Sequence, residues 1–241
     1  PKRTYKDMSD KPEMIIALTP FEALCGFDSV TASVGRLKKY GWHDEAEQLR
    51  THGIKKYMQW AFAQKQLPSL VDVPDWLSHI ESLYPNDPAI RVAPLLNHVS
   101  LNPGQVLSLP AGNLHAYLNG AGLEVMASSD NVVRAGFTTK HIDVSELLAV
   151  VDATPLAEPI VIPMIDEEWT HYTSPSPAFD VASFGWVNQA VITPSPHSRM
   201  IFGTTDANAP QPHMMYVPAG ESLTVTGPPK ARCVSWVFTQ N

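Results

Sequence analysis

The sequence predicts a mainly β protein, made of barrel or sandwich sheets, with a helical insertion near its beginning. Two observations lead to this fold class. The 22 prolines are sparse between residues 21 and 67 but frequent after Pro85, and β-branched residues are few before that point. After Leu95, apolar and polar residues alternate between proline- and glycine-containing turns, a pattern typical of strands with one buried face.

The predicted helical part covers residues 19–84. Thr19 is a candidate N-cap, with Pro20 at the first helical position and Glu22 three residues after the cap, so a helix is predicted from Phe21 onwards. Helical patterns then follow over residues 30–41, 43–66 and 76–84. Several helices of ordinary length indicate a small helical layer inserted into the β fold.

The predicted β part begins with residues 98–118, which contain turns at 102–104 and 110–112. Another strand is predicted at 123–126 and a short helix at 144–152, capped by Asp143 or Ser145. A proline-rich linker leads to a second β region, with strands predicted over residues 179–188, 190–194, 199–204, 214–227 and 231–238.

Charge and hydropathy exclude several classes of protein. No apolar run approaches the roughly 18 residues that a membrane span requires, and the net charge of −7 argues against a nucleic-acid partner. The polar N-terminus lacks a secretion signal, so Cys25 and Cys233 are interpreted as free thiols of a cytoplasmic protein. An acidic chain repels phosphorylated substrates, so a phosphate site would need local cations.

The sharpest motif is Gly104-x5-Pro110-x-Gly112-x2-His115-x3-Asn119. Two glycine-containing turns bracket two antiparallel strands, and the alternation directs His115 into the barrel, where an imidazole can bind a metal. The spacing resembles the second half of the cupin signature. Without that spacing, His115 would be read as an ordinary inward histidine between two β-turns.

Two further segments are candidates for chemistry. Arg134 and Lys140 could clamp a phosphate, with Asp130 and Glu124 holding those cations or handling hydroxyl protons. A surface loop with compensating charges explains the same residues without a site. In Lys11-Pro12-Glu13, a lone glutamate on an apolar strand needs a metal or ion pair unless this is a solvated strand start.

Taken in order, residues 11–27, the intervening helices and residues 109–143 resemble the type I mannose-6-phosphate isomerase family. The resemblance implies two cupin-type barrels with a small helical domain, and a Zn²⁺-dependent enzyme that acts on a sugar phosphate. It implies that Glu13 and His115 are zinc ligands and that Arg134 and Lys140 bind substrate. The residues it places in the catalytic pocket are Arg134, Lys11, Tyr117, Asp130 and Glu124.

The same resemblance divides the chain into four segments. Residues 1–18 hold a strand of the catalytic barrel, 19–94 the helical insertion, 95–152 the rest of that barrel, and 153–241 a C-terminal cupin-like domain. The turn at 218–222 has no histidine at the ligand spacing, so this second barrel is expected to be non-catalytic.

The chain departs from the family pattern at three places. Asp10 stands where the family has His, Thr139 stands where it has Pro, and the Gln-x-His segment that supplies two zinc ligands is absent from the sequence. The chain is therefore expected to be an N-terminally truncated piece with an incomplete first barrel. It is expected to be inactive alone or to pair with a missing N-terminal segment.

Two other functions stay open on the sequence alone. An iron-dependent cupin dioxygenase would need histidine-rich ligation, whereas only His115 stands at a ligand spacing. A cupin that binds sugar phosphates without turning them over would keep the pocket and lose the metal. Otherwise the expected reaction is aldose–ketose isomerisation through an enediol between mannose 6-phosphate and fructose 6-phosphate.

Overall fold

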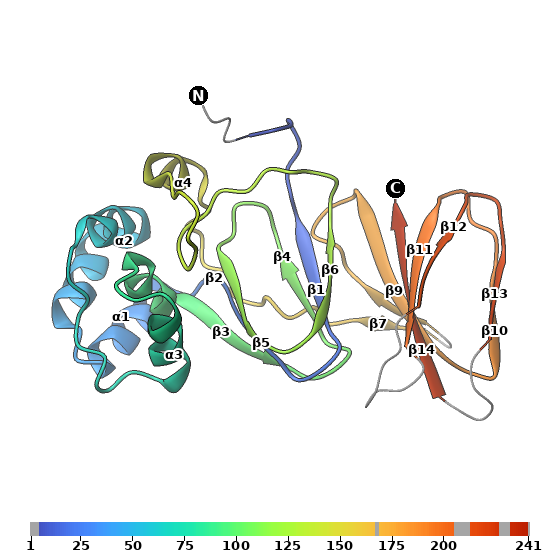
Figure 1. Ribbon diagram of the computed structural model, residues 1–241, viewed down its shortest axis with the longest axis horizontal. Coiled ribbons are helices and arrows are strands. Elements are labelled where there is room, and N and C mark those ends of the chain that lie inside the picture. Colours follow the sequence, from blue (N-terminus) through green and yellow to red (C-terminus); the bar gives the residue numbers. More distant parts are fainter. Residues whose placement is uncertain (1–4, 167–168, 205–212, 227–231, 241) are drawn as a thin grey trace.

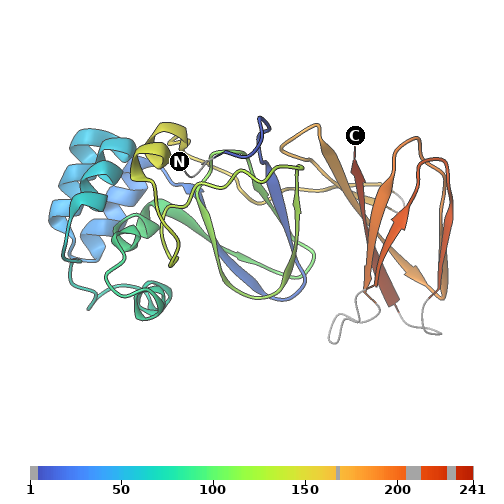
Figure 2. The same ribbon diagram turned by 45° about the horizontal axis from the view of Figure 1, so that its top comes forward.

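The computed structural model describes residues 5–166, 169–204, 213–226 and 232–240. Figure 1 shows three parts in a row: a helical layer at one end, β1–β6 in the middle and β7–β14 at the other end. Figure 2 shows the same order from a second direction. The predicted fold class, mainly β with a helical layer, is confirmed.

The helical layer packs against one face of the middle β part. It consists of α1 (Val30–Lys39), α2 (His43–Ala63), α3 (Asp75–Leu83) and the 3₁₀ turns η1 (Pro88–Arg91) and η2 (Ala93–Leu95). Its core includes Trp42 and Tyr57 together with Leu24 from the neighbouring sheet. The predicted helices at 30–41, 43–66 and 76–84 therefore form, α2 with a bend at Gly53, where φ is +73°.

The helix predicted from Phe21 is wrong, because this segment is strand β2 (Phe21–Phe27). Cys25 packs into the interior of the β part, whereas Leu24 packs against the helices, so both faces of the strand are buried. A strand covered on both faces reads as a continuous apolar run, which periodicity cannot tell from a helix. Thr19 caps no helix: its Oγ1 accepts a hydrogen bond from the Ala121 amide at 2.9 Å.

The middle part is two facing three-stranded antiparallel sheets, in the orders β4-β1-β6 and β3-β2-β5. Both sheets contribute to one core, which includes Ile15 and Leu107 from the first sheet and Phe21 and Cys25 from the second. The strands are β1 (Glu13–Ala17), β2, β3 (Leu96–Leu101), β4 (Val106–Leu109), β5 (His115–Asn119) and β6 (Gly122–Met126).

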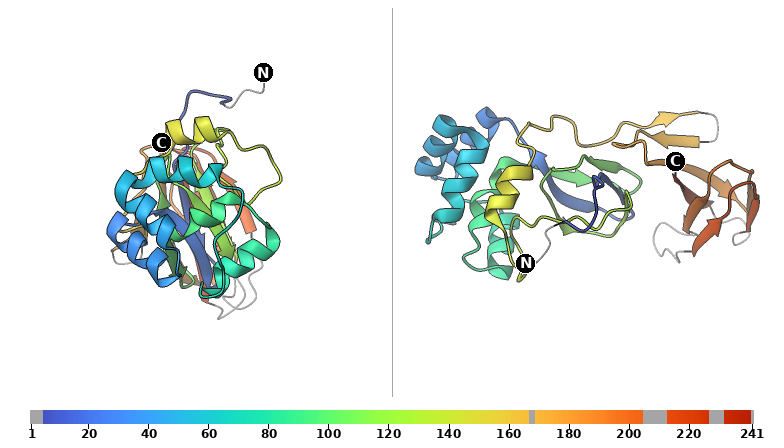
Figure 3. Two further views of the ribbon diagram at one scale, coloured as in Figure 1. Left: turned by 90° about the vertical axis from the view of Figure 1, so that its left-hand side faces the viewer. Right: turned by 90° about the horizontal axis from the view of Figure 1, so that it is seen from above.

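Helix α4 (Val144–Val150) begins at Asp143, whose side chain accepts a hydrogen bond from the Glu146 amide at 3.0 Å, as the capping pattern predicted. The chain then runs along the middle part towards the last sheets (Figure 3). On the way Val161 donates to the carbonyl of Val106 at 2.8 Å.

The last part contains a six-stranded sheet in the order β12-β11-β14-β9-β8-β7 and a two-stranded sheet, β10-β13. Phe202 and Trp236 of the large sheet pack against Met14 and Ile16, which joins the two β parts. The strands are β7 (Met164–Ile165), β8 (Trp169–Tyr172), β9 (Phe179–Val187), β10 (Gln189–Ile192), β11 (Arg199–Thr204), β12 (His213–Val217), β13 (Leu223–Thr226) and β14 (Arg232–Gln240). The predicted strands correspond to β9, β10, β11 and β14, and the one predicted over 214–227 is divided into β12 and β13, whereas β7 and β8 were not predicted.

The two cysteines are far apart in sequence. Cys25 is a free thiol and fully buried, and burial raises its pKa to about 12, which makes it unreactive. The side chain of Cys233 lies outside the described residues.

Strands β5 and β6 each pair on one side only among the described residues. Their other backbone edges present unpaired N–H and C=O groups, which favour pairing with another chain. We expect the chain to self-associate with rising concentration, as measured by analytical ultracentrifugation. A single monomeric species across the whole concentration range would contradict this expectation.

Candidate active site

The two residues predicted to bind metal lie side by side. Glu13 opens β1 and is 8% exposed, whereas His115 opens β5 in the facing sheet. Nε2 of His115 lies 3.2 Å from Oε2 of Glu13, and Nζ of Lys11 lies 3.4 Å from Oε1 of the same carboxylate. The fold thus joins the histidine motif to the Lys11-Pro12-Glu13 segment across the interior of the β part.

The orientation of the imidazole follows from its second nitrogen. Nδ1 of His115 lies 3.2 Å from the carbonyl oxygen of Asn113, and beside a carbonyl it can only be a donor. Nε2 therefore faces Glu13. In a neutral imidazole it would present a lone pair to a carboxylate, so a proton or a metal ion has to lie between the two.

The two groups shift each other's ionisation. Burial opposes the charge of Glu13, but its hydrogen bond and charge interaction with His115, aided by Lys11, hold its pKa below the ordinary value. Burial likewise acts to lower the pKa of His115, but the bond to Glu13 outweighs it and the pKa of His115 is raised. The pocket is thus arranged to hold positive charge next to Glu13.

A second carboxylate completes the cluster. Glu124 on β6 brings a ligand atom close to those of Glu13 and His115, all of them within 4.8 Å of one another. Tyr117 on β5 donates its hydroxyl hydrogen bond to Oε1 of Glu124 at 2.7 Å. Burial and this bond raise the pKa of Tyr117, so Tyr117 acts as a donor that orients Glu124.

The cluster suits zinc. Imidazole nitrogen and carboxylate oxygen are ordinary zinc ligands, and bonds of about 2.0–2.2 Å at tetrahedral angles place two ligand atoms about 3.4 Å apart. The 3.2 Å between Nε2 of His115 and Oε2 of Glu13 is close to that separation. Three side-chain ligands and one open position are typical of a catalytic zinc site.

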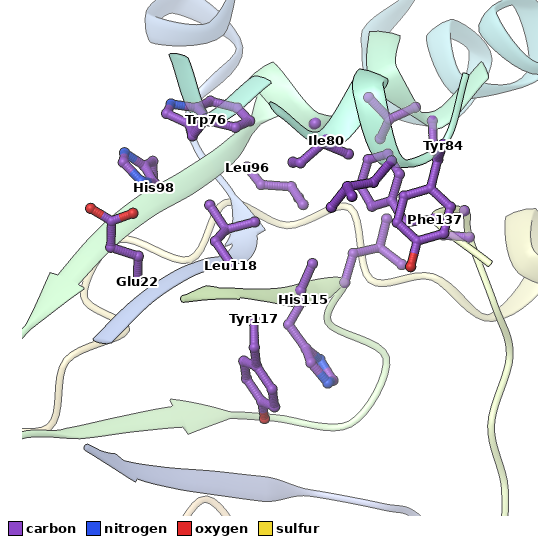
Figure 4. A pocket seen from close by; sticks show the side chains of 18 of the residues that line it. Glu22, Trp76, Ile80, Tyr84, Leu96, His98, His115, Tyr117, Leu118 and Phe137 are labelled. Carbon is purple, nitrogen blue, oxygen red and sulfur yellow. The ribbon is translucent and has the colours of Figure 1, made fainter. Parts of the chain in front are cut away.

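Two adjoining cavities border the cluster. One, of about 1020 Å³, lies between α3 and β5 and is lined by His115, Tyr117 and Arg134. Figure 4 shows that His115 and Tyr117 point away from the helical layer, whereas Leu118 points towards Trp76. The other cavity, of about 770 Å³, is lined by Lys11, Glu13, His115 and Glu124. His115 thus stands where both cavities meet.

Arg134 lies on the strap, which we define as residues 127–143 and which has no regular secondary structure. At its far side Phe137 donates its backbone amide to Oδ2 of Asp87 at 2.7 Å. Gly136 packs so closely on the helical layer that a Cβ there would lie 2.1 Å from Cβ of Ala89. Among the described residues no carboxylate forms an ion pair with Arg134, so its guanidinium is available to an anionic ligand.

Two predicted site residues lie elsewhere. Asp130 is 76% exposed at its side chain and pairs with Lys6, with 3.0 Å between Nζ and Oδ2. It lines a different cavity, between the two β parts. Lys140 is exposed on the strap and does not line the cavity of Arg134. The expected pair of cations is therefore not brought together here, and Arg134 is the strap cation at the pocket.

Sequence reasoning missed the contact that fixes the near side of the strap. The carboxylate of Asp7 accepts hydrogen bonds from the Asp130 amide at 2.9 Å and from Oγ of Ser129 at 2.9 Å. Asn131 in turn donates to the carbonyl oxygens of Asp7, at 3.1 Å, and Ser9, at 3.0 Å. We call these hydrogen bonds the Asp7 clamp. They join segments that are 122 or more residues apart in sequence, so no local pattern could reveal them.

We expect Asp7→Ala to free the near side of the strap. Hydrogen exchange of the backbone amides at 129–137 should become faster, whereas Asp72→Ala, which changes an exposed aspartate in another turn, should leave this exchange unchanged.

The same contact should depend on pH. Hydrogen bonds from the Asp130 and Ser9 amides hold the pKa of Asp7 below its ordinary value. The clamp should therefore be intact above that ordinary value and weaken as pH falls through the lowered one. Equal exchange in Asp7→Ala and wild type would refute the clamp.

Comparisons with known proteins agree with this geometry. Residues 1–30 match the sequence model of a family described as phosphomannose isomerase type I, catalytic domain. The chain is 39% identical over 168 residues to mannose-6-phosphate isomerase of Escherichia coli K12, covering 61% of this chain and 43% of that protein. The enzyme of Rattus norvegicus is 36% identical over 188 residues, covering 63% and 44%. The predicted resemblance to type I phosphomannose isomerases is confirmed.

Solved phosphomannose isomerase structures carry the same fold. The apo mannose 6-phosphate isomerase from Salmonella typhimurium superposes with a TM-score of 0.74 at 25% identity, covering 100% of this chain and 69% of that one. A mannose 6-phosphate isomerase bound with zinc and yttrium gives the same score and identity, covering 100% and 68%. The chain spans less than half the length of the curated relatives named here. No helix in the described part of the chain is long and apolar enough to cross a membrane.

Proposed function

We propose that this chain carries the metal centre of a zinc-dependent isomerase that interconverts mannose 6-phosphate and fructose 6-phosphate. The observation that carries the proposal is the approach of Nε2 of His115 to Oε2 of Glu13, 3.2 Å apart, with Glu124 beside them. The relatives support the substrate, because they are named mannose-6-phosphate isomerases. A solved relative with zinc bound supports the metal.

Glu13, His115 and Glu124 would hold the zinc ion. Bound zinc would polarise the oxygens of an open-chain sugar and favour loss of a proton next to the carbonyl. Lys11 offsets part of the negative charge of Glu13, and the Asn113 carbonyl, bonded to Nδ1 of His115, would leave its Nε2 free to bind the ion. Tyr117 holds Glu124 in place through its hydroxyl.

The reaction in this proposal moves a proton between C1 and C2 of the sugar through an enediol. Negative charge develops on the sugar oxygens during that transfer. Arg134, on the wall of the adjoining cavity and without an ion-pair partner among the described residues, would stabilise this charge. Because the chain is acidic overall, this local cation also favours binding of the phosphate ester.

The test is turnover of mannose 6-phosphate by the zinc-loaded chain, followed by a coupled assay for fructose 6-phosphate. Because Glu124 adds a third ligand to Glu13 and His115, we expect this chain to turn over alone, contrary to the expectation from the absent Gln-x-His segment. Chelation should abolish that turnover and added zinc should restore it. Binding of the sugar phosphate without turnover would support the alternative, a binding protein with this pocket. Turnover that survives complete removal of metal would contradict the proposal.

A further inference from the structure

The last β part contains a buried cation that has no counter-ion among the described residues. Arg199, the first residue of β11, is 8% exposed. Its Nη2 donates to the carbonyl oxygens of Thr193 at 2.5 Å and Glu221 at 3.4 Å. Its Nε is buried with no hydrogen-bond acceptor, and no described carboxylate lies within ion-pair distance of the guanidinium.

Such an arrangement is costly unless something completes it. Arginine stays charged in proteins, so burial cannot be relieved by loss of the proton. Two carbonyl dipoles partly solvate the charge, but removing a cation from water without a paired anion carries a large free-energy penalty. Within the part of the chain that the structure describes, the residue is therefore incompletely satisfied.

A cavity of about 800 Å³, with both polar and apolar residues in its wall, lies against Arg199. Strands β11 and β14 are neighbours in the large sheet (Figure 1). In their register Arg199 stands opposite Thr239, so the two side chains share a face. The cavity lies on that face, and His171 of β8 also lines it. Its wall is rich in hydroxyl groups, from Thr173, Ser174, Ser176, Ser195 and Thr239.

The acidic residues of this cavity do not neutralise Arg199. Asp166 accepts hydrogen bonds from the Trp169 amide at 3.0 Å and interacts with Nε2 of His171 at 3.1 Å. Asp180 has interactions of its own, and Thr239 stands between it and Arg199 in the register, about two strand spacings of roughly 4.8 Å apart.

Arg199 also borders the cleft between the two β parts, but that cleft is a poorer place for an anion. It is lined by three aspartates, Asp7, Asp10 and Asp130, whose negative charges oppose an anionic ligand. The hydroxyl-lined cavity has two, of which Asp166 already interacts with His171. The hydroxyl-lined cavity offers donors on several sides of a single guanidinium, which is the composition that suits a tetrahedral oxyanion.

We propose that the cavity at Arg199 is a second anion site, separate from the candidate active site, and that it takes a phosphate group. Arg199 supplies the charge, and the hydroxyls of Thr239 and Ser195 supply further donors. The ligand is inorganic phosphate or the phosphate of a small phosphorylated metabolite.

The test is calorimetric titration with inorganic phosphate in the Arg134→Ala background, which removes the strap cation of the candidate active site. We expect phosphate to bind this variant, and Arg134→Ala/Arg199→Gln to lose that binding. Arg199→Lys keeps the charge but loses the planar fork, so we expect it to bind more weakly than arginine does. Absence of phosphate binding to Arg134→Ala, or equal binding after Arg199→Gln, would overturn the proposal.

Two further experiments keep the test valid if a variant unfolds and identify the source of the phosphate. Thr239→Val removes one hydroxyl at nearly constant volume, so if Arg199→Gln unfolds, as circular dichroism would show, this variant should still weaken phosphate binding. Unchanged affinity in a folded Thr239→Val would also contradict the proposal. Mannose 6-phosphate should compete with inorganic phosphate at this site if a metabolite is the ligand, whereas mannose alone should never compete. Competition by mannose would refute phosphate recognition.

Discussion

Replacing His115 or Glu13 by alanine is expected to abolish zinc binding. In the proposed site each side chain would supply one of three ligands, and the loss of either would leave too few ligands for zinc. Changes in residues that only support zinc ligands cost about 10–100-fold in affinity, so the loss of a ligand itself should exceed that range. The measurement is competitive titration of zinc against a chromogenic chelator.

The matched control for His115→Ala is His98→Ala. His98 lies on β3 of the same sheet but stacks on Trp76 of the helical layer, with ring centroids 5.2 Å apart, so it faces away from the cluster. We expect His98→Ala to bind zinc as the wild type does. Full zinc affinity in a folded His115→Ala would show that the ion is held elsewhere.

The second large effect is expected at Arg134. Arg134→Ala should lower kcat by about 10²–10³-fold, the usual cost of removing one group that stabilises developing charge. Lys140→Ala should change kcat little, because Lys140 does not line the cavity, and any effect should appear as weaker substrate binding. Steady-state kinetics with mannose 6-phosphate separate the two. Equal losses of kcat in both variants would contradict this division.

The fold could be predicted where the sequence pattern matches one buried face. Strands β9, β11 and β14 of the last β part alternate or carry β-branched runs, and they form as expected. The segment Phe21–Phe27 was wrongly predicted as a helix, because both faces of this strand are buried, one against the facing sheet and one against the helices. Thr19, which was predicted to cap this helix, instead accepts a hydrogen bond from the backbone amide of Ala121, 102 residues away in the sequence.

The proximity of two candidate site residues could be anticipated because both lie in short motifs. The turn spacing around His115 and the isolated Glu13 on an apolar strand both indicated ligands, and the fold brings them to 3.2 Å. The position of Glu124 relative to that pair depends on how β6 pairs with β1, which no local pattern states. Asp130 lies near Arg134 in sequence, but its backbone amide bonds to Asp7 and its side chain pairs with Lys6, two contacts that no local pattern indicates.

X-ray absorption at the zinc edge, on the 241-residue chain loaded with one equivalent of zinc, tests the central claim most directly. The account predicts a shell of one imidazole and carboxylate or water oxygens, with a changed oxygen contribution in Glu124→Gln. A shell with sulfur, several imidazoles, or no bound zinc at all would contradict a metal centre built from Glu13, His115 and Glu124.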